Sequence, residues 1–415
     1  MTDAGTPTGP VTRSSVTRVG AATAVSALCG YAVLYLAARD LDPAGFSVFG
    51  VFWGAFGLVT GAAFGLLQQT TREIRLAARP GSATHAAPIT RPLRLAAAVG
   101  VAAAVVVVAT AVLWAPHVFV ESCRLSVLLL AAGLACFCLH ATLLGMLAGA
   151  DRWSQYGALM VTDAAIRVVI AVVTVVLGWG LTGFLWATVG GALSWLLLLL
   201  TSPTARAAGA LVAHESPASF LRGASHAVAA AGASAILVMG FPVLLKATSG
   251  DLGAAGGVVI LAVTLTRAPL LVPLTAMQGN LIAHFVDARA HRLRAVARAV
   301  SALVVVGGVG IALAALTGPW LLRVGFGEQY HASGALLAWL TAGAVVIAVL
   351  TVTGAATVAA ALHRAYSLGW VCATVAAAAL LTLPLGLEAR TIVALVCGPL
   401  VGIAVHLAAL AQVKD

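Results

Sequence analysis

The 415-residue chain is 61% hydrophobic and only 9% charged, and its mean hydropathy is +1.06. These values exceed what a soluble globular domain carries, so the composition predicts a polytopic membrane protein. The formal net charge of +10 is mostly a matter of membrane topology, and no nucleic acid is expected as a partner.

Twelve apolar stretches are each long enough to span a bilayer. They lie at residues 19–38, 46–67, 93–115, 125–149, 156–178, 180–201, 222–246, 255–286, 295–317, 333–361, 365–386 and 390–411. The expected fold class is therefore all-α, with about 12 transmembrane helices in two parallel six-helix bundles around a central cavity. The polar stretches between them leave no room for a soluble catalytic domain.

The polar connection 202–221 divides the chain, because prolines and serines punctuate it between the sixth and seventh spans. The expected domains are a disordered cytoplasmic tail (1–18), an N-terminal six-helix bundle (19–201), a cytoplasmic linker (202–221) and a C-terminal six-helix bundle (222–415). Since six spans are an even number, both halves enter the membrane from the same side. That arrangement is typical of a parallel repeat.

The basic residues predict the orientation, because cytoplasmic loops hold the excess of positive charge. With the N-terminus inside, sixteen of the 23 basic residues fall in the cytoplasm and five outside, while Arg167 and Arg267 lie in the membrane. We therefore expect a multi-pass protein of the cell membrane with both termini cytoplasmic. The basic loops 69–94 and 287–298 are expected to touch anionic lipid headgroups.

The second span has glycines at four-residue spacing, so that one helix face is nearly bare backbone. They are Gly50 and Gly54, then Gly57, Gly61 and Gly65. This face indicates either tight static packing or a sliding surface for a moving bundle. Polar residues that include Gln68 and Arg72 follow the span, and they could line the inner mouth of the cavity.

The fifth span holds Asp163 and Arg167 four residues apart, near the middle of the bilayer. This spacing places both side chains on one helix face and indicates a structural ion pair. The alternative is a coupling site for a proton or another cation, since Asp163 is the only acidic residue that we place in the hydrocarbon region.

The eighth span contains Arg267, with no acidic side chain within a helical turn of it. A lone cation at this depth costs at least ~2.5 kcal/mol unless it pairs or faces water, so Arg267 is a candidate contact for an anionic cargo. Pro269 and Pro273 follow it and predict a bent, partly broken helix. Further polar groups on the same stretch are Gln278, Asn280 and His284.

Two segments carry a resemblance to a known family. Residues 39–46 read Arg-Asp-Leu-Asp-Pro-Ala-Gly-Phe, and residues 318–330 contain Gly-Pro-Trp-Leu-Leu followed by Phe-Gly-Glu-Gln-Tyr. These segments are similar to the turn before the second helix and the loop before the tenth helix in one branch of the multidrug/oligosaccharidyl-lipid/polysaccharide (MOP) flippase superfamily. That branch is the O-antigen flippase-like branch of polysaccharide biosynthesis.

The resemblance implies an alternating-access exporter that moves a lipid-diphosphate-linked oligosaccharide, a precursor of cell-envelope polysaccharide, from the inner to the outer leaflet. Membrane lipids and a polysaccharide polymerase or glycosyltransferase are the further partners it implies. Arginine suits phosphate oxygens, so Arg267 is the first candidate contact and Arg72 the second. The other candidate cargo contacts are Gln68, Gln278, Asn280 and His284.

Two other functions stay open. A cation-coupled multidrug antiporter would use Asp163 and Arg167 for coupling, although the multidrug branch commonly has an acid in its first helix and residues 19–38 have none. A polytopic membrane glycosyltransferase would need acid and base groups gathered at one face, whereas the outer acids are scattered. The six cysteines have no metal-site spacing. We expect a transporter, without a metal or cofactor, rather than an enzyme.

Overall fold

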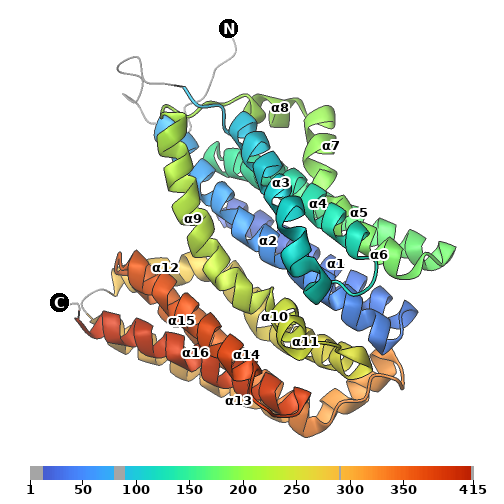
Figure 1. Cartoon of the computed structure of the whole chain (residues 1–415). Coiled ribbons are helices and arrows are strands. Elements are labelled where there is room, and N and C mark those ends of the chain that lie inside the picture. Colours follow the sequence, from blue (N-terminus) through green and yellow to red (C-terminus); the bar gives the residue numbers. More distant parts are fainter. Residues whose placement is uncertain (1–12, 79–88, 289–290, 413–415) are drawn as a thin grey trace.

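The computed structural model describes residues 13–78, 89–288 and 291–412 (Figure 1). Its elements are α1 (Arg13–Asp40), α2 (Pro43–Ala77), α3 (Pro92–Val118), α4 (Cys123–Gly149), α5 (Trp153–Leu177), α6 (Gly180–Gly190), η1 (Gly191–Leu193), α7 (Ser194–Thr201), α8 (Pro203–Gly209), α9 (Pro217–Val238), α10 (Phe241–Ser249), α11 (Gly253–Ala276), α12 (Gln278–Asp287), α13 (Arg292–Phe326), α14 (Gly334–Ala359), α15 (His363–Leu381) and α16 (Leu387–Gln412). Within these ranges, 12 helices are long and apolar enough to cross a membrane. The predicted all-α fold with twelve spans is confirmed.

Several boundaries differ from the prediction. Helix α1 begins at Arg13, so residues 13–18 of the expected tail are helical, while residues 1–12 lie outside the described ranges. The expected linker contains the short helix α8. The expected seventh span is two helices, α9 and α10, that meet at Met239 and Gly240. Pro242 lies in the first turn of α10, where its missing N–H is harmless, but it cannot continue α9.

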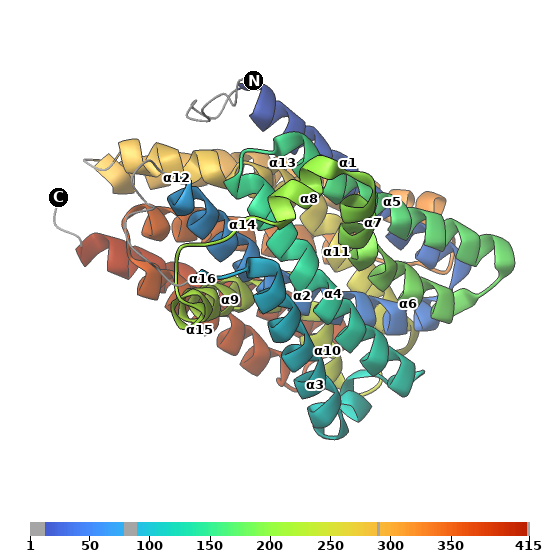
Figure 2. The same ribbon diagram turned by 90° about the horizontal axis from the view of Figure 1, so that it is seen from above.

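The helices form two groups (Figure 1). Helices α1 to α8 lie in one group and α10 to α16 in the other, with α9 running between them. Seen from above, α9 is nearly end-on beside α15 (Figure 2). It packs against both α15 and α2. Thus α9 bridges the two groups.

The two ends of the molecule are distinguished by their contacts. At one end, Arg18 donates to Ser154 Oγ at 3.1 Å, and Arg75 pairs with Asp151 at 3.0 Å. We call this end, at which α1 begins and α2 ends, the terminal side. At the opposite side, α1 ends at Asp40 and α2 begins.

The glycine face of α2 forms the contact between the two groups. Ile260 of α11, Met239 and Pro242 near the break, and Ala235 and Val228 of α9 pack on it. A Cβ added at Gly65 would lie 2.3 Å from the Val228 backbone nitrogen. Backbones approach this closely only where side chains are missing, and in a bilayer such packing replaces the hydrophobic effect between helices.

A buried bond between a histidine and a hydroxyl joins the fourth span to the sixth and, in the second half of the chain, the tenth span to the twelfth. In the first group, His140 Nδ1 lies 3.0 Å from Ser194 Oγ, between α4 and α7. In the second, His406 Nδ1 lies 3.0 Å from Thr353 Oγ1, between α16 and α14. The histidine lies on the fourth span in one half and on the twelfth span in the other, so the two bonds join corresponding pairs of helices.

The contact at Gly65 yields a stability prediction. Replacing Gly65 with alanine should lower the free energy of unfolding by about 2 kcal/mol, because the added methyl group overpacks the α2–α9 contact. The matched control is Gly308→Ala on α13, where an added Cβ has nothing within 4 Å. That variant should keep or slightly raise stability through alanine's better helix propensity. Thermal unfolding in detergent measures both, and equal losses would contradict the close contact.

Candidate functional site

Arg267 lies on α11, which does not break where the sequence predicts. Helix α11 continues through Pro269 and Pro273 to Ala276, and the break comes at Met277, before α12. The prolines are tolerated inside the helix because other groups in a membrane protein can take up the freed carbonyls. The helix break that lies beside Arg267 is instead on a neighbouring element, between α9 and α10.

The Arg267 guanidinium contacts the end of α9. Its Nη1 donates to Val238 O at 3.0 Å and to Leu237 O at 3.4 Å, and its Cζ lies 5.2 Å from the Phe241 ring centroid. These carbonyls belong to the last turn of α9, where no helical N–H follows to satisfy them. A cation at a helix C-terminus also interacts favourably with the helix dipole. Arg267 thus caps α9 just before the break at Gly240.

The rest of the guanidinium is unused. Arg267 is only 7% exposed, yet its Nε and Nη2 atoms have no hydrogen-bond partner within the described part of the chain. Nε–H and Nη2–H form one edge of the planar group, and that edge fits two oxygens of a carboxylate or phosphate. A buried donor pair without acceptors is costly, so this edge is suited to an anionic ligand.

A cavity of about 150 Å³ adjoins Arg267 between the two helix groups. Tyr31 of α1 and Trp53 of α2 line it from the first group, and Thr264 and Arg267 of α11 line it from the second. The described residues that line the cavity therefore include one cation, three aromatic residues, since Phe46 of α2 also lines it, and the hydroxyls of Tyr31 and Thr264. Sequence reasoning missed Tyr31 and Trp53, since only the packing of α1 and α2 against α11 brings them to Arg267.

The other predicted cargo contacts lie elsewhere. Gln68 and Arg72 are exposed near the end of α2, and Arg72 pairs with Glu73 at 3.0 Å. Asn280 and His284 are exposed on α12. None of these four is among the described residues that line the Arg267 cavity. The side chain of Gln278 lies outside the described part of the structure.

A polar contact on the terminal side escaped sequence reasoning. Gln69 and Glu73 are buried on α2, and Gln69 Nε2 donates to Glu73 Oε1 at 3.1 Å. A Cβ at Gly223 of α9 would lie 2.4 Å from Gln69 Nε2, and Glu73 interacts with Glu215 just before α9. The signal was available, because Gln69 and Glu73 continue the four-residue spacing of the glycine face.

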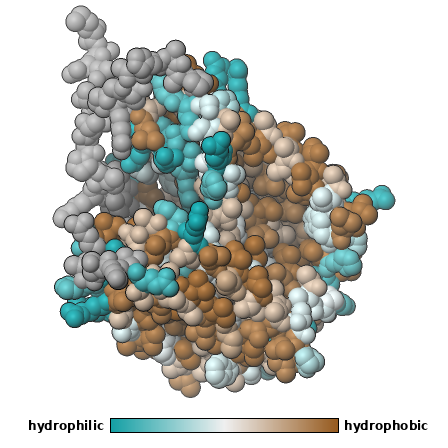
Figure 3. All heavy atoms as spheres, turned by 60° about the vertical axis from the view of Figure 1, so that its left-hand side comes forward, coloured by the Kyte–Doolittle hydropathy of each residue, from teal (hydrophilic) through white to brown (hydrophobic). Residues whose placement is uncertain are grey.

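Figure 3 shows a band of hydrophilic residues on one face of the molecule, with apolar residues over most of the rest.

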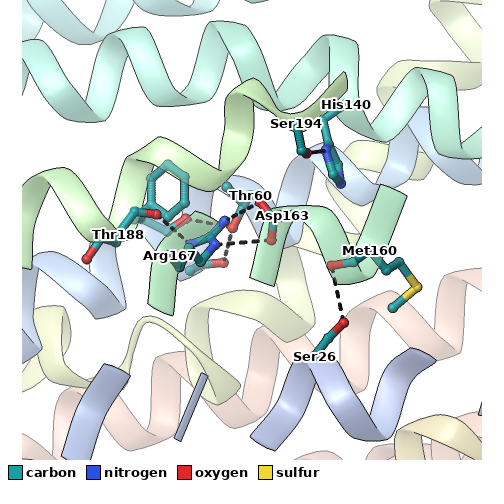
Figure 4. Close-up of polar contacts among 10 residues, drawn as sticks. Ser26, Thr60, His140, Met160, Asp163, Arg167, Thr188 and Ser194 are labelled. Atoms are coloured by element: carbon teal, nitrogen blue, oxygen red, sulfur yellow. Dashed lines mark hydrogen bonds and ion pairs between the residues drawn. The ribbon is translucent and has the colours of Figure 1, made fainter. Parts of the chain in front are cut away.

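Asp163 and Arg167 form the predicted ion pair (Figure 4). Arg167 donates through Nη2 to Asp163 Oδ1 at 3.0 Å and through Nε to Oδ2 at 3.1 Å. Its Nη1 donates to Thr188 O on α6, and its Cζ lies 5.3 Å from the Phe56 ring centroid. Gly191 leaves room for the pair, because a Cβ there would lie 2.5 Å from Asp163 Oδ1. Both carboxylate oxygens are thus used by the chain's own arginine.

The fold is that of a MATE transporter. An inward-facing structure of a multidrug resistance MATE family transporter of the MOP superfamily aligns with a TM-score of 0.71 and 18% identity, covering 97% of this chain and 100% of that one. The outward-facing structure of such a transporter aligns with a TM-score of 0.60 and 15% identity, covering 97% and 96%. At these identities the likeness establishes the fold, a multi-pass membrane transporter fold.

Sequence relatives give the family. Uncharacterized protein Rv3630 of Mycobacterium tuberculosis is 64% identical over 412 residues, which is 98% of this chain and 94% of that protein. Uncharacterized protein Rv1510 of the same organism is 62% identical over 418 residues, covering 100% and 96%. The chain belongs to the family of Rv3630 and Rv1510. No family model matches the sequence.

The ion pair yields a second prediction. Asp163→Ala should lower stability by about 3 kcal/mol, because it leaves the Arg167 guanidinium partly buried without its carboxylate. Adding Arg167→Met should recover much of the loss by removing the unpaired charge. Asp151→Asn, which removes the charge of the exposed pair with Arg75 and suits the positive φ of that position, is the control and should cost less than about 1 kcal/mol. Thermal unfolding in detergent compares the three, and an Asp163→Ala loss no larger than that of Asp151→Asn would contradict a structural role.

Proposed function

We propose that this protein flips a lipid-diphosphate-linked oligosaccharide from the inner to the outer leaflet by alternating access. The observation that carries the proposal is the buried Arg267, whose Nε and Nη2 donors are unpartnered beside a cavity between the helix groups. A diphosphate supplies the paired oxygens that this edge of the guanidinium fits. Such a cargo needs a cation at bilayer depth. A charged side chain is costly to place there, so a buried arginine with free donors indicates a functional contact.

The proposed binding mode leaves the cap on α9 intact. Nη1 keeps its bonds to Leu237 O and Val238 O, while the opposite edge takes the diphosphate. Tyr31 and Trp53 provide aromatic faces in the same cavity. A 150 Å³ space is small for an oligosaccharide, so the sugar would extend toward the terminal side. Gln68, Arg72, Gln278, Asn280 and His284 remain proposed contacts for that part of the cargo.

On the side opposite the terminal side, an aromatic cluster joins the two helix groups. Tyr35 of α1 meets Phe326 of α13 with ring centroids 5.6 Å apart, and Phe46 of α2 meets Tyr330 at 6.0 Å. Tyr330 is fully buried, and burial and the Asp42 charge both raise its pKa, so the ring stays neutral. The higher TM-score to the inward-facing neighbour supports a state closed on this side. In the proposal, this is the outer gate and the terminal side faces the cytoplasm.

A multidrug antiporter is the second candidate, because the solved neighbours are multidrug resistance transporters. The antiporter fits the fold about as well as the flippase does. In that case Asp163 would have to release Arg167 in order to take a coupling cation. The charge of the cargo distinguishes the two candidates. The unused edge of Arg267 attracts anions and so favours the lipid diphosphate.

The cargo prediction concerns Arg267. In a strain that lacks the protein, Arg267→Ala should restore export at least tenfold less well than the wild type, because the buried phosphate donors are lost. Arg267→Lys should be intermediate, since it keeps the charge without the fork. Surface glycan and trapped lipid-linked saccharide are measured at matched expression.

Arg294→Ala is the control, since Arg294 is exposed at the beginning of α13, and it should export normally. Normal export by Arg267→Ala would overturn the assigned role. If no lipid-linked saccharide accumulates and Asp163→Asn alone abolishes drug resistance, the antiporter is the correct function.

The gate prediction uses Phe46 and Tyr330. With the six natural cysteines replaced, the double variant Phe46→Cys/Tyr330→Cys is treated with a short, reducible bifunctional thiol reagent. The link should stop export by holding the two groups together, and reduction should restore it. Each single-cysteine variant is the control and should be insensitive to the reagent. Export at the unlinked rate by the linked protein would contradict a moving gate at this contact.

A further inference from the structure

A groove of about 520 Å³ lies on the terminal side between the beginnings of α3 and α9. Thr90, Arg91, Arg94 and Ala98 line it at the start of α3, and Pro217 lines it at the start of α9. It shares no lining residue with the Arg267 cavity. It is therefore a separate place on the molecule from the proposed cargo site.

The groove is positively charged. The side chains of Arg91 and Arg94 are exposed, and neither forms a hydrogen bond or ion pair within the described ranges of the chain. The first turn of α3 has no acidic residue, and its N-cap makes no side-chain hydrogen bond. The positive end of the helix dipole adds to the two guanidinium groups. The groove is thus complementary to an anionic group.

The groove continues into an apolar face of α3. The residues along this face are Arg94, Ala98, Val101, Val105, Val108 and Val112. Successive members are three or four residues apart, so they lie on one side of the helix. The four valines are exposed, and α3 packs mainly on α4. A ligand along this face would need a charged head and apolar chains.

The depth of the groove fits a lipid. The span Pro92–Val118 begins at the groove, which places Arg91 and Arg94 where headgroups meet hydrocarbon. Basic residues at this level attract anionic lipids, each contributing about 1 kcal/mol. The valine face then lies at the level of the acyl chains.

We propose that this groove binds one anionic phospholipid, with its phosphate between Arg91 and Arg94 and its chains along the valine face. The lipid contacts α3 of the first helix group and Pro217, the first residue of α9. The protein already joins these segments here, because Thr90 N–H donates to Ala213 O at 3.0 Å and Ala213 N–H donates to Thr90 O at 2.9 Å. The bound lipid reinforces this attachment of α9 to the first group.

The test is native mass spectrometry of the full-length protein titrated with phosphatidylglycerol or phosphatidylcholine. For the first phosphatidylglycerol, the apparent dissociation constant should rise roughly tenfold or more in Arg91→Gln/Arg94→Gln. The control Arg294→Gln/Arg298→Gln removes two exposed arginines four residues apart on α13. Although these two arginines are expected to touch headgroups, they do not line the groove, so the first and tightest binding step should be unchanged. Phosphatidylcholine should bind all three proteins equally.

Two further arms separate a lipid site from simple charge attraction. Ala98→Trp fills the groove at an exposed position without changing charge, and it should weaken the first phosphatidylglycerol as the arginine variant does. Soluble glycerol 3-phosphate, which has the phosphate without chains, should not displace the lipid. Equal weakening by both double variants, unchanged binding in Arg91→Gln/Arg94→Gln, or displacement by glycerol 3-phosphate would each overturn the proposal. All variants are first checked for an unchanged unfolding temperature.

Discussion

The close approach of α2 to α9, α10 and α11 is the contact on which the rest of the structure depends. Lipid chains are as apolar as the helices, so burial alone does not hold the two groups together, and close backbone packing supplies the attraction. The same packing sets where the cavity lies, because Gly50 lets Ile260 of α11 come against α2. With larger residues on this face, Trp53 and Arg267 would not line one cavity.

The Arg267 side chain caps α9 and still has two unpartnered donors, which a shorter or differently shaped cation could not provide together. Its planar group has donors on more than one edge, so it can cap α9 while another edge stays available. The cap also explains why the buried charge is tolerated without a carboxylate, since two backbone carbonyls and the Phe241 ring partly replace water. Because the cap and the free edge belong to one rigid group, an occupant of the cavity is mechanically connected to the end of α9.

The sequence was sufficient for features that depend on spacing within one helix. Four-residue spacing predicted the glycine face and the Asp163–Arg167 pair, and apolar length predicted the spans. It failed where the outcome depends on which helices meet. Pro269 and Pro273 suggested a break in α11, yet the chain breaks at Gly240 and Met277 instead. Gln68 and Arg72 were expected at the inner mouth of the cavity; the structure exposes them near the end of α2, and they do not line the pocket beside Arg267. Their contact with a cargo stays a prediction, because spacing along one helix does not tell how far a cavity extends.

The packing of α9 determines what a spectroscopic label would report about the relative motion of the two helix groups. Helix α9 is joined by the chain to the second group through Gly240, but its length lies along α2 of the first. If α9 travels with α2, the chain must flex at Met239 and Gly240. A label placed before Gly240 would then report the position of the first group, and a label placed after it would report that of the second. Two neighbouring attachment points could therefore record opposite displacements, so sequence proximity is a poor guide to which rigid body a probe follows.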